Sequence, residues 1–131
     1  MIEEAIINLL LTIPELAAIV GDRIFPNIIK ADEEYPAVYV AANRMEPMQC
    51  DNPMGMHNGV VEVGIFADDY VHCLDAMAAI RNVLNDYAGK IGNIGIKFQR
   101  GQHGPDGWDD ELKTHIKVVE YEAFARVSST N

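Results

Sequence analysis

The chain of 131 residues is 49% hydrophobic and carries 20 acidic against 10 basic side chains, a formal net charge of −10. This length suits one globular domain over residues 1–131, with enough apolar residues for a core. An acidic surface repels phosphate, which argues against nucleic-acid binding driven by charge, and no apolar run is long enough to cross a membrane.

The first residues predict two helical pieces. Apolar side chains recur at helical spacing over residues 2–12, which indicates an amphipathic helix with glutamates in its first turn. Thr12 is expected to cap a second, shorter piece that takes Pro14 in its first turn. Gly21 is expected to close that piece.

The next residues predict a hairpin. Arg23 to Ile29 is rich in β-branched and aromatic residues but is broken by Pro26, so it should be a short or edge strand. Lys30–Glu34 is the expected turn. Pro36 then opens a second strand that becomes polar toward Arg44.

A buried strand and a helix follow in the middle of the chain. Alternating apolar residues over 61–67 predict the strand, and Asp68 or Asp69 can cap the helix. Gly89 is expected to end the helix. Its apolar face steps by 4, 3, 4 and 3 through Cys73, Met77, Ile80, Leu84 and Tyr87.

The last third predicts two strands. Residues 94–99 alternate after the glycine-rich segment GKIGNIG, which is expected to be a connector, and a long strand runs from Leu112 to Val127. These strands should form a hairpin with its tip at about residues 101–111. The apolar phase switches between Val118 and Val119, which predicts a β-bulge there. Residues 128–131 form a polar tail.

The predicted order is therefore α-β-β-β-α-β-β. It indicates an α+β domain in which two main helices pack on a mostly antiparallel sheet of about five strands.

The sequence predicts no catalytic residue, no metal site and no cofactor. The four histidines are scattered without metal-ligand spacing, and the acidic run over residues 106–111 lacks the alternation of a calcium loop. No serine or cysteine has a nucleophile motif. The histidines are His57, His72, His103 and His115.

Two segments are candidates for binding a partner. Four methionines crowd into residues 45–56, and they predict a flexible loop at about residues 46–57 that either adapts to a partner or folds back on its own domain. The acidic hairpin tip is the second candidate. The candidate residues are Met45, Met48, Met54, Met56, Trp108, Asp109 and Asp110.

Four stretches of the chain resemble the tail-completion or tail-terminator proteins of long-tailed bacteriophages and prophages. They are PELAAIVGDRIFPNII, EYPAVYV, VEVGIFA and AMAAIRNVLND, and the similarity spans roughly residues 2–127. The segments RMEPMQCDNPMGMHNG and GQHGPDGWDDE depart from the family pattern.

The resemblance implies a structural role and no enzymatic activity. Members of the family form a ring, typically a hexamer, which caps the tail tube and joins it to the head connector. The implied partners are further copies of the chain, the major tail-tube protein and the connector protein, while DNA passes through the lumen without specific binding. The implied location is the tail or neck of a virion assembled in the cytoplasm of a bacterial host.

Two other functions stay open. Another phage neck or capsid-attachment adaptor subunit has the same composition and would differ in its docking surface. A small enzyme would need a pocket with converging polar groups, and the sequence offers no spaced set of carboxylates, histidines or cysteines for one.

Overall fold

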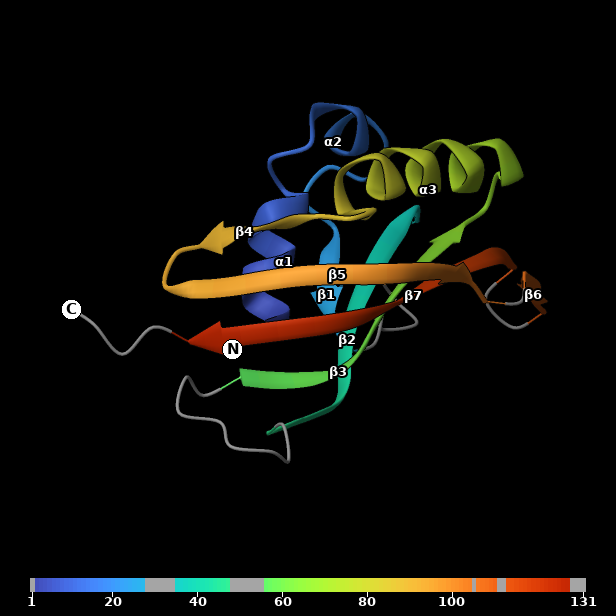
Figure 1. The fold of residues 1–131 in the computed structure, drawn as a ribbon. Coiled ribbons are helices and arrows are strands. Elements are labelled where there is room, and N and C mark those ends of the chain that lie inside the picture. Colours follow the sequence, from blue (N-terminus) through green and yellow to red (C-terminus); the bar gives the residue numbers. More distant parts are fainter. Residues whose placement is uncertain (1, 28–34, 48–55, 105, 111–112, 128–131) are drawn as a thin grey trace.

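The computed structural model describes residues 2–27, 35–47, 56–104, 106–110 and 113–127. These residues form three helices and one sheet of seven strands (Figure 1). The helices are α1 (Ile2–Leu10), α2 (Pro14–Val20) and α3 (Tyr70–Leu84). The strands are β1 (Ile24–Pro26), β2 (Ala37–Pro47), β3 (Met56–Ala67), β4 (Ala88–Ile91), β5 (Ile94–His103), β6 (Gly107–Asp109) and β7 (Thr114–Val127).

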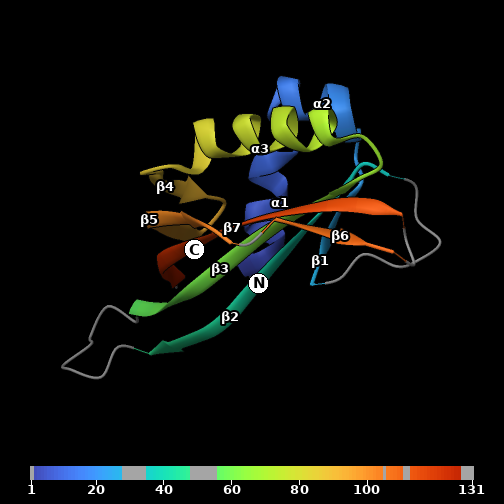
Figure 2. The same ribbon diagram turned by 90° about the vertical axis from the view of Figure 1, so that its right-hand side faces the viewer.

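The strands lie in the order β1-β2-β3-β7-β5-β4, and β6 pairs with the beginning of β7. Strand β1 is parallel to β2, and every other described pairing is antiparallel. The sheet curls, and α1 contacts β1 and β2 near one edge and β4 at the other. Figure 2 shows α1 between β4 and β1, beneath α2 and α3. Helix α1 therefore packs against both edge strands of the sheet, where an approaching chain could otherwise pair with the backbone.

The core lies between the helices and the inner face of the sheet. Alternate residues of β3 and β7 are fully or almost fully buried, and Val63 of β3 pairs with Val119 of β7 across the ladder. Leu16 of α2 and Ile80 of α3 are fully buried against this face. The inner residues of β3, β5 and β7 are Val61, Val63, Ile65, Ala67, Ile94, Ile96, Phe98, Val119, Tyr121, Ala123 and Ala125.

The predicted fold needs correction in strand number, helix number, order and pairing. The sheet has seven strands rather than about five, three helices replace two, and the order is α-α-β-β-β-α-β-β-β-β. The sheet is also mixed, because β1 runs parallel to β2 and does not form the predicted hairpin: Val38 N–H donates to Arg23 O, and Asn27 N–H donates to Val40 O. The turn predicted at Lys30–Glu34 lies outside the described residues.

Of the residues predicted to begin or end the helices, two are confirmed and two are not. Gly21, with φ +60°, ends α2 as predicted, and Asp69 caps α3 by accepting a hydrogen bond from Val71 N–H at 2.8 Å. Thr12 does not cap α2, because its hydroxyl and its backbone N–H both donate to Leu9 O at the end of α1. Helix α3 ends before Gly89, since Asp86 already takes a left-handed conformation with φ +57°.

Two local predictions in the second half are wrong. The GKIGNIG segment is a hairpin of β4 and β5 rather than a connector, because Gly92 provides the positive φ of a tight turn. Strand β7 pairs with β3 without a break between His115 and Arg126, and the register shift lies instead in β5 between Gln99 and Gln102. The apolar phase changes along β7 because its outer face is also partly covered.

Strands extend into two segments that were predicted as loops. Strand β2 continues to Pro47 and β3 begins at Met56, so both ends of the loop predicted at about 46–57 belong to strands, and residues 48–55 lie outside the described residues. The predicted tip at 101–111 contains the end of β5 and all of β6. The polar tail at 128–131 is also outside the described residues.

Two glycines on the outer face of the sheet give a matched test of its packing. The ring of Tyr39 covers Gly64, and an ideal Cβ at Gly64 would lie 2.1 Å from Tyr39 Cε1. Gly64→Ala should therefore lower the free energy of unfolding in urea by about 1–3 kcal/mol. Gly95→Ala is the control, because its Cβ would meet only Arg126 O at 3.8 Å. It should raise stability by about 0.5–1 kcal/mol. Equal effects at both positions would contradict this packing.

Candidate functional site

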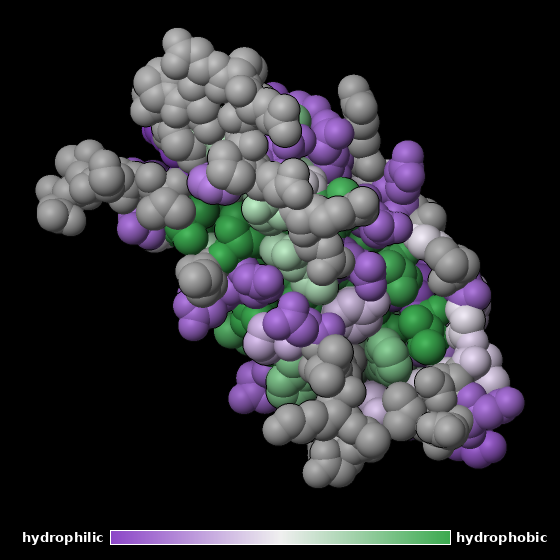
Figure 3. Space-filling view, turned by 90° about the horizontal axis from the view of Figure 1, so that it is seen from below, coloured by the Kyte–Doolittle hydropathy of each residue, from purple (hydrophilic) through white to green (hydrophobic). Residues whose placement is uncertain are grey.

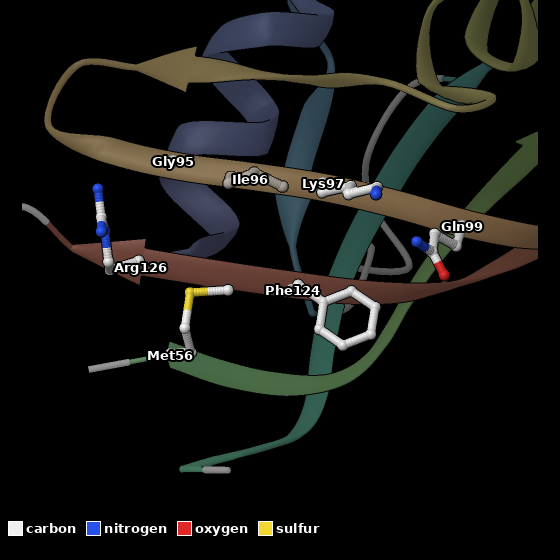
Figure 4. Close-up of a pocket in the computed structure, with 7 residues that line it drawn as sticks. All are labelled: Met56, Gly95, Ile96, Lys97, Gln99, Phe124 and Arg126. Atoms are coloured by element: carbon white, nitrogen blue, oxygen red, sulfur yellow. The ribbon is translucent and has the colours of Figure 1, made fainter. Parts of the chain in front are cut away.

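A shallow groove lies on the outer face of the sheet, across β3, β7 and β5. Its volume is about 420 Å³. Met56, Arg126 and Gly95 form one cross-strand row, and Phe124 pairs with Lys97 in the next row. Because Gly95 has no side chain, the first row is hollow between Arg126 and β4. The lining residues are Met56, Gly95, Ile96, Lys97, Gln99, Phe124 and Arg126 (Figure 4).

The groove combines apolar and basic side chains. Phe124 and Met56 are half-buried, whereas Lys97 and Arg126 are exposed. Lys90 of β4 pairs with Gly95 and so stands on the same face of the sheet. Three of the ten basic residues of a chain with net charge −10 therefore lie in or beside this groove. Seen from below, away from α2 and α3, the molecule shows hydrophobic patches separated by hydrophilic residues (Figure 3).

An exposed apolar surface lies near the other end of β7, where α3 begins. The ring of His115 contacts Trp108 of β6 with centroids 4.7 Å apart and Tyr70 of α3 with centroids 5.4 Å apart. Val71 and Leu74 continue this surface along α3, because residues three and four apart are neighbours on a helix. We call Tyr70, Val71, Leu74, Trp108 and His115 the aromatic cluster.

The aromatic cluster concentrates exposed apolar surface in one place. Among the described residues, five large hydrophobic side chains are exposed, and four of them belong to it: Tyr70, Val71, Leu74 and Trp108, at 41–57%. Leu11, at 42%, is the fifth. Monomeric proteins scatter such residues singly, so their concentration here indicates an interaction surface.

Acidic residues surround the aromatic cluster. Asp69, which caps α3, and Asp75 of α3 are exposed beside Tyr70 and Leu74 in the sequence. Asp110 accepts a hydrogen bond from Trp108 Nε1 at 2.8 Å, which holds the indole in place. Asp106 forms an ion pair with Lys117 at 2.9 Å. The surroundings of this cluster are thus mostly negative, in contrast to the basic groove.

A polar contact lies on the outer face between the groove and the cluster. The Tyr39 hydroxyl donates to Glu62, and the Tyr39 ring packs edge-on against Phe66. Burial and the neighbouring Glu62 carboxylate raise the pKa of Tyr39 above its usual value. This pair fixes the ring over Gly64, and it is a structural contact because the phenol stays protonated.

Cys73 is fully buried, and its Sγ lies 3.5 Å from the His115 backbone O. Burial raises the pKa of the thiol to about 11. Because the thiolate is the reactive form, this environment suits a packing role and opposes nucleophilic chemistry.

The sequence-predicted partner residues do not form one site. Met45 packs against the core, whereas Met56 lines the groove. Trp108 and Asp110 lie at the aromatic cluster, and Asp109 contributes its backbone to β6 opposite Thr114. Met48 and Met54 are outside the described residues.

Sequence reasoning missed most residues of both surfaces. Lys97, Phe124 and Arg126 become neighbours only through the pairing of β5 with β7. Tyr70 and Leu74 did have a signal, because they are apolar but lie off the helix face that carries Cys73, Met77 and Ile80.

Within the described part of the chain, no group of three or more histidine, cysteine, aspartate or glutamate side chains is arranged to hold a metal ion. None of the helices described there combines the length and apolar character needed to span a membrane.

Comparison with known proteins identifies a shared fold. No protein-family model matches the chain, and no curated protein matches it. A protein in the virion of a native gene transfer agent particle aligns with a TM-score of 0.57 and 18% identity, over 95% of this chain and 92% of that one. A second solved structure, described without a function, aligns with a TM-score of 0.52 and 10% identity over 100% of this chain and 99% of the other. At these identities the likeness establishes the fold.

The buried thiol leads to a prediction about alkylation. At pH 8 the raised pKa of Cys73 leaves about 100-fold less thiolate than the ordinary value of 9.0, and burial slows access further. Iodoacetamide should therefore label Cys73 at least that much more slowly in native protein than in urea, as followed by peptide mass spectrometry. The raised pKa also links stability to pH. Below the pKa of the thiol in the unfolded chain, the protonated Cys73 adds its full contribution to the free energy of unfolding, and this contribution is lost as pH rises through about 11. Equal labelling rates in both states would contradict the buried position.

Proposed function

We propose that this chain is a structural subunit of a phage or phage-like particle. The observation that carries the proposal is the fold shared almost end to end with a protein of the gene transfer agent virion, a phage-like particle. A fold alone does not define function, so the surfaces and the sequence resemblance must support the finer assignment.

In its finer form, the proposal is a tail-completion protein that forms a ring, caps the tail tube and joins it to the head connector. The sequence stretches that resemble this family lie in α2, β1, β2, β3 and α3, which are five of the ten described helices and strands. The two exposed surfaces near opposite ends of β7 suit a subunit with a neighbour on each side. The net charge of −10 suits a channel through which DNA slides without adhering.

The groove gives little support to an enzymatic function. Its seven lining residues include no carboxylate, histidine, cysteine or hydroxyl side chain. Acid–base and nucleophilic chemistry need such groups close together. A neck or capsid-attachment adaptor draws equal support from the shared fold, and it differs from a tail-completion protein in the partner that it binds.

Assembly with the tail-tube protein tests the proposed function. Purified chain should be monomeric or weakly associated, and at high concentration or with the major tail-tube protein of the same particle it should form rings, predominantly hexamers. Native mass spectrometry and negative-stain microscopy measure both outcomes, with an unrelated acidic protein as the control for charge. Binding to the connector but not to the tube would instead support a neck adaptor. A stable dimer that never forms a larger species would contradict the ring.

A further inference from the structure

The two surfaces described above are complementary in charge and in apolar character. The groove has Phe124 and Met56 within it and the exposed cations Lys97 and Arg126 beside them. The aromatic cluster presents projecting apolar side chains among mostly acidic residues. One surface is hollow and basic, and the other projects and is acidic.

The two surfaces cannot meet within one subunit. Trp108 pairs with His115 near the start of β7, whereas Phe124 and Arg126 lie near its end. The strand between His115 and Arg126 spans roughly 35–37 Å at the usual rise per residue. It is paired along its whole length, so it keeps the two surfaces apart.

The geometry points to a contact in which the groove of one subunit receives the aromatic cluster of a second copy. This inference rests on the proposed ring and specifies which surfaces build it. Because the two contacting surfaces differ, the association is head-to-tail, and an associated pair keeps one free cluster on one subunit and one free groove on the other. Repetition of such a contact gives a closed ring when the rotation closes. A groove of about 420 Å³ is within the range that holds small molecules larger than an indole ring.

The groove suits a protein surface better than it suits DNA. Lys97 and Arg126 alone would also attract phosphate. However, the half-buried Phe124 and Met56 gain from apolar contact, and a phosphate backbone does not offer it. The rest of this acidic chain would also repel a duplex lying across the sheet. A second copy supplies both an apolar surface and negative charge.

Gly95→Val tests the groove without disturbing the core. The new side chain would fill the hollow on the outer face, and a Cβ at Gly95 makes only an ordinary contact with Arg126 O. A β-branched residue also suits a strand, so the subunit should stay folded. The expected result is association weakened about tenfold or more, measured by native mass spectrometry over a concentration series.

Leu74→Gln tests the aromatic cluster, with Leu11→Gln as its matched control. Leu74 is 41% exposed within the cluster, and Leu11 is 42% exposed outside both surfaces. Leu74→Gln should weaken association by a factor similar to Gly95→Val, and Leu11→Gln should leave it unchanged. Circular dichroism and thermal unfolding check that all three variants stay folded.

Two double substitutions test whether the charge complementarity contributes to association. Lys97→Gln with Arg126→Gln removes the cations of the groove and should weaken association. Ala17→Glu with Ala18→Glu makes the same change in net charge on the exposed side of α2 and should have a much smaller effect. Equal effects would show that only overall repulsion matters and would overturn the assigned contact.

The single tryptophan reports directly on the contact. Trp108 is 49% exposed, so its emission should shift to the blue and its quenching by acrylamide should fall as wild-type chains associate. The same titration with Gly95→Val should show neither change at concentrations where wild type associates.

The outcomes separate this inference from the proposed function. Rings that form normally in Gly95→Val and Leu74→Gln would overturn the assigned surfaces and leave the tail-completion proposal standing. Wild type that forms no ring, even with the tail-tube protein, would overturn both. Binding of duplex DNA that the groove variants abolish, with unaltered rings, would assign the groove to DNA and also overturn the inference.

Discussion

The pairing of β7 on both of its sides is the constraint on which the rest of the structure depends. This strand bonds to β3 along one side and to β5 and β6 along the other. Its residues 119, 121, 123 and 125 enter the core, while Phe124 and Arg126 stand on the outer face. One face of β7 therefore contributes to the core, and its other face contributes to the groove. Because β7 lies between β3 and β5, the sheet is continuous only when β7 pairs with both of them.

Helix α1 packs where the curled, open sheet has its two edge strands. Strands β1 and β4 form the two edges, and each would expose backbone groups to other chains. The helix contacts both edge strands, and its buried residues Ile6 and Leu10 join the core. Pro26 in β1 also removes an amide that could pair with a further strand. The helix against both edge strands and the proline in β1 therefore disfavour extension of the sheet by another chain at these strands.

The sequence predicted what local patterns determine, and it did not predict what distant pairing determines. Asp69 and Gly21 were identified correctly because a cap and a left-handed glycine act within a few residues. The parallel pairing of β1 with β2 was missed, since tight punctuation between two strands is also typical of a hairpin. The same difference between local patterns and distant pairing applies to the residues of the groove and of the aromatic cluster. Trp108 could be proposed as a candidate from its own segment, but Lys97 and Arg126 are brought together by a ladder between residues far apart in the chain.

The charge distribution bears on how such a subunit would balance solubility against assembly. A net charge of −10 keeps free copies apart through mutual repulsion, which falls with distance and with added salt. A contact between a basic groove and an acidic cluster is attractive only when two copies meet in one orientation, so it opposes the general repulsion locally. The electrostatic part of such a contact selects the head-to-tail geometry, and the burial of Phe124, Leu74 and Trp108 supplies most of its affinity. Separate roles for charge and apolar surface allow a chain to remain dispersed in solution and still assemble where copies are concentrated.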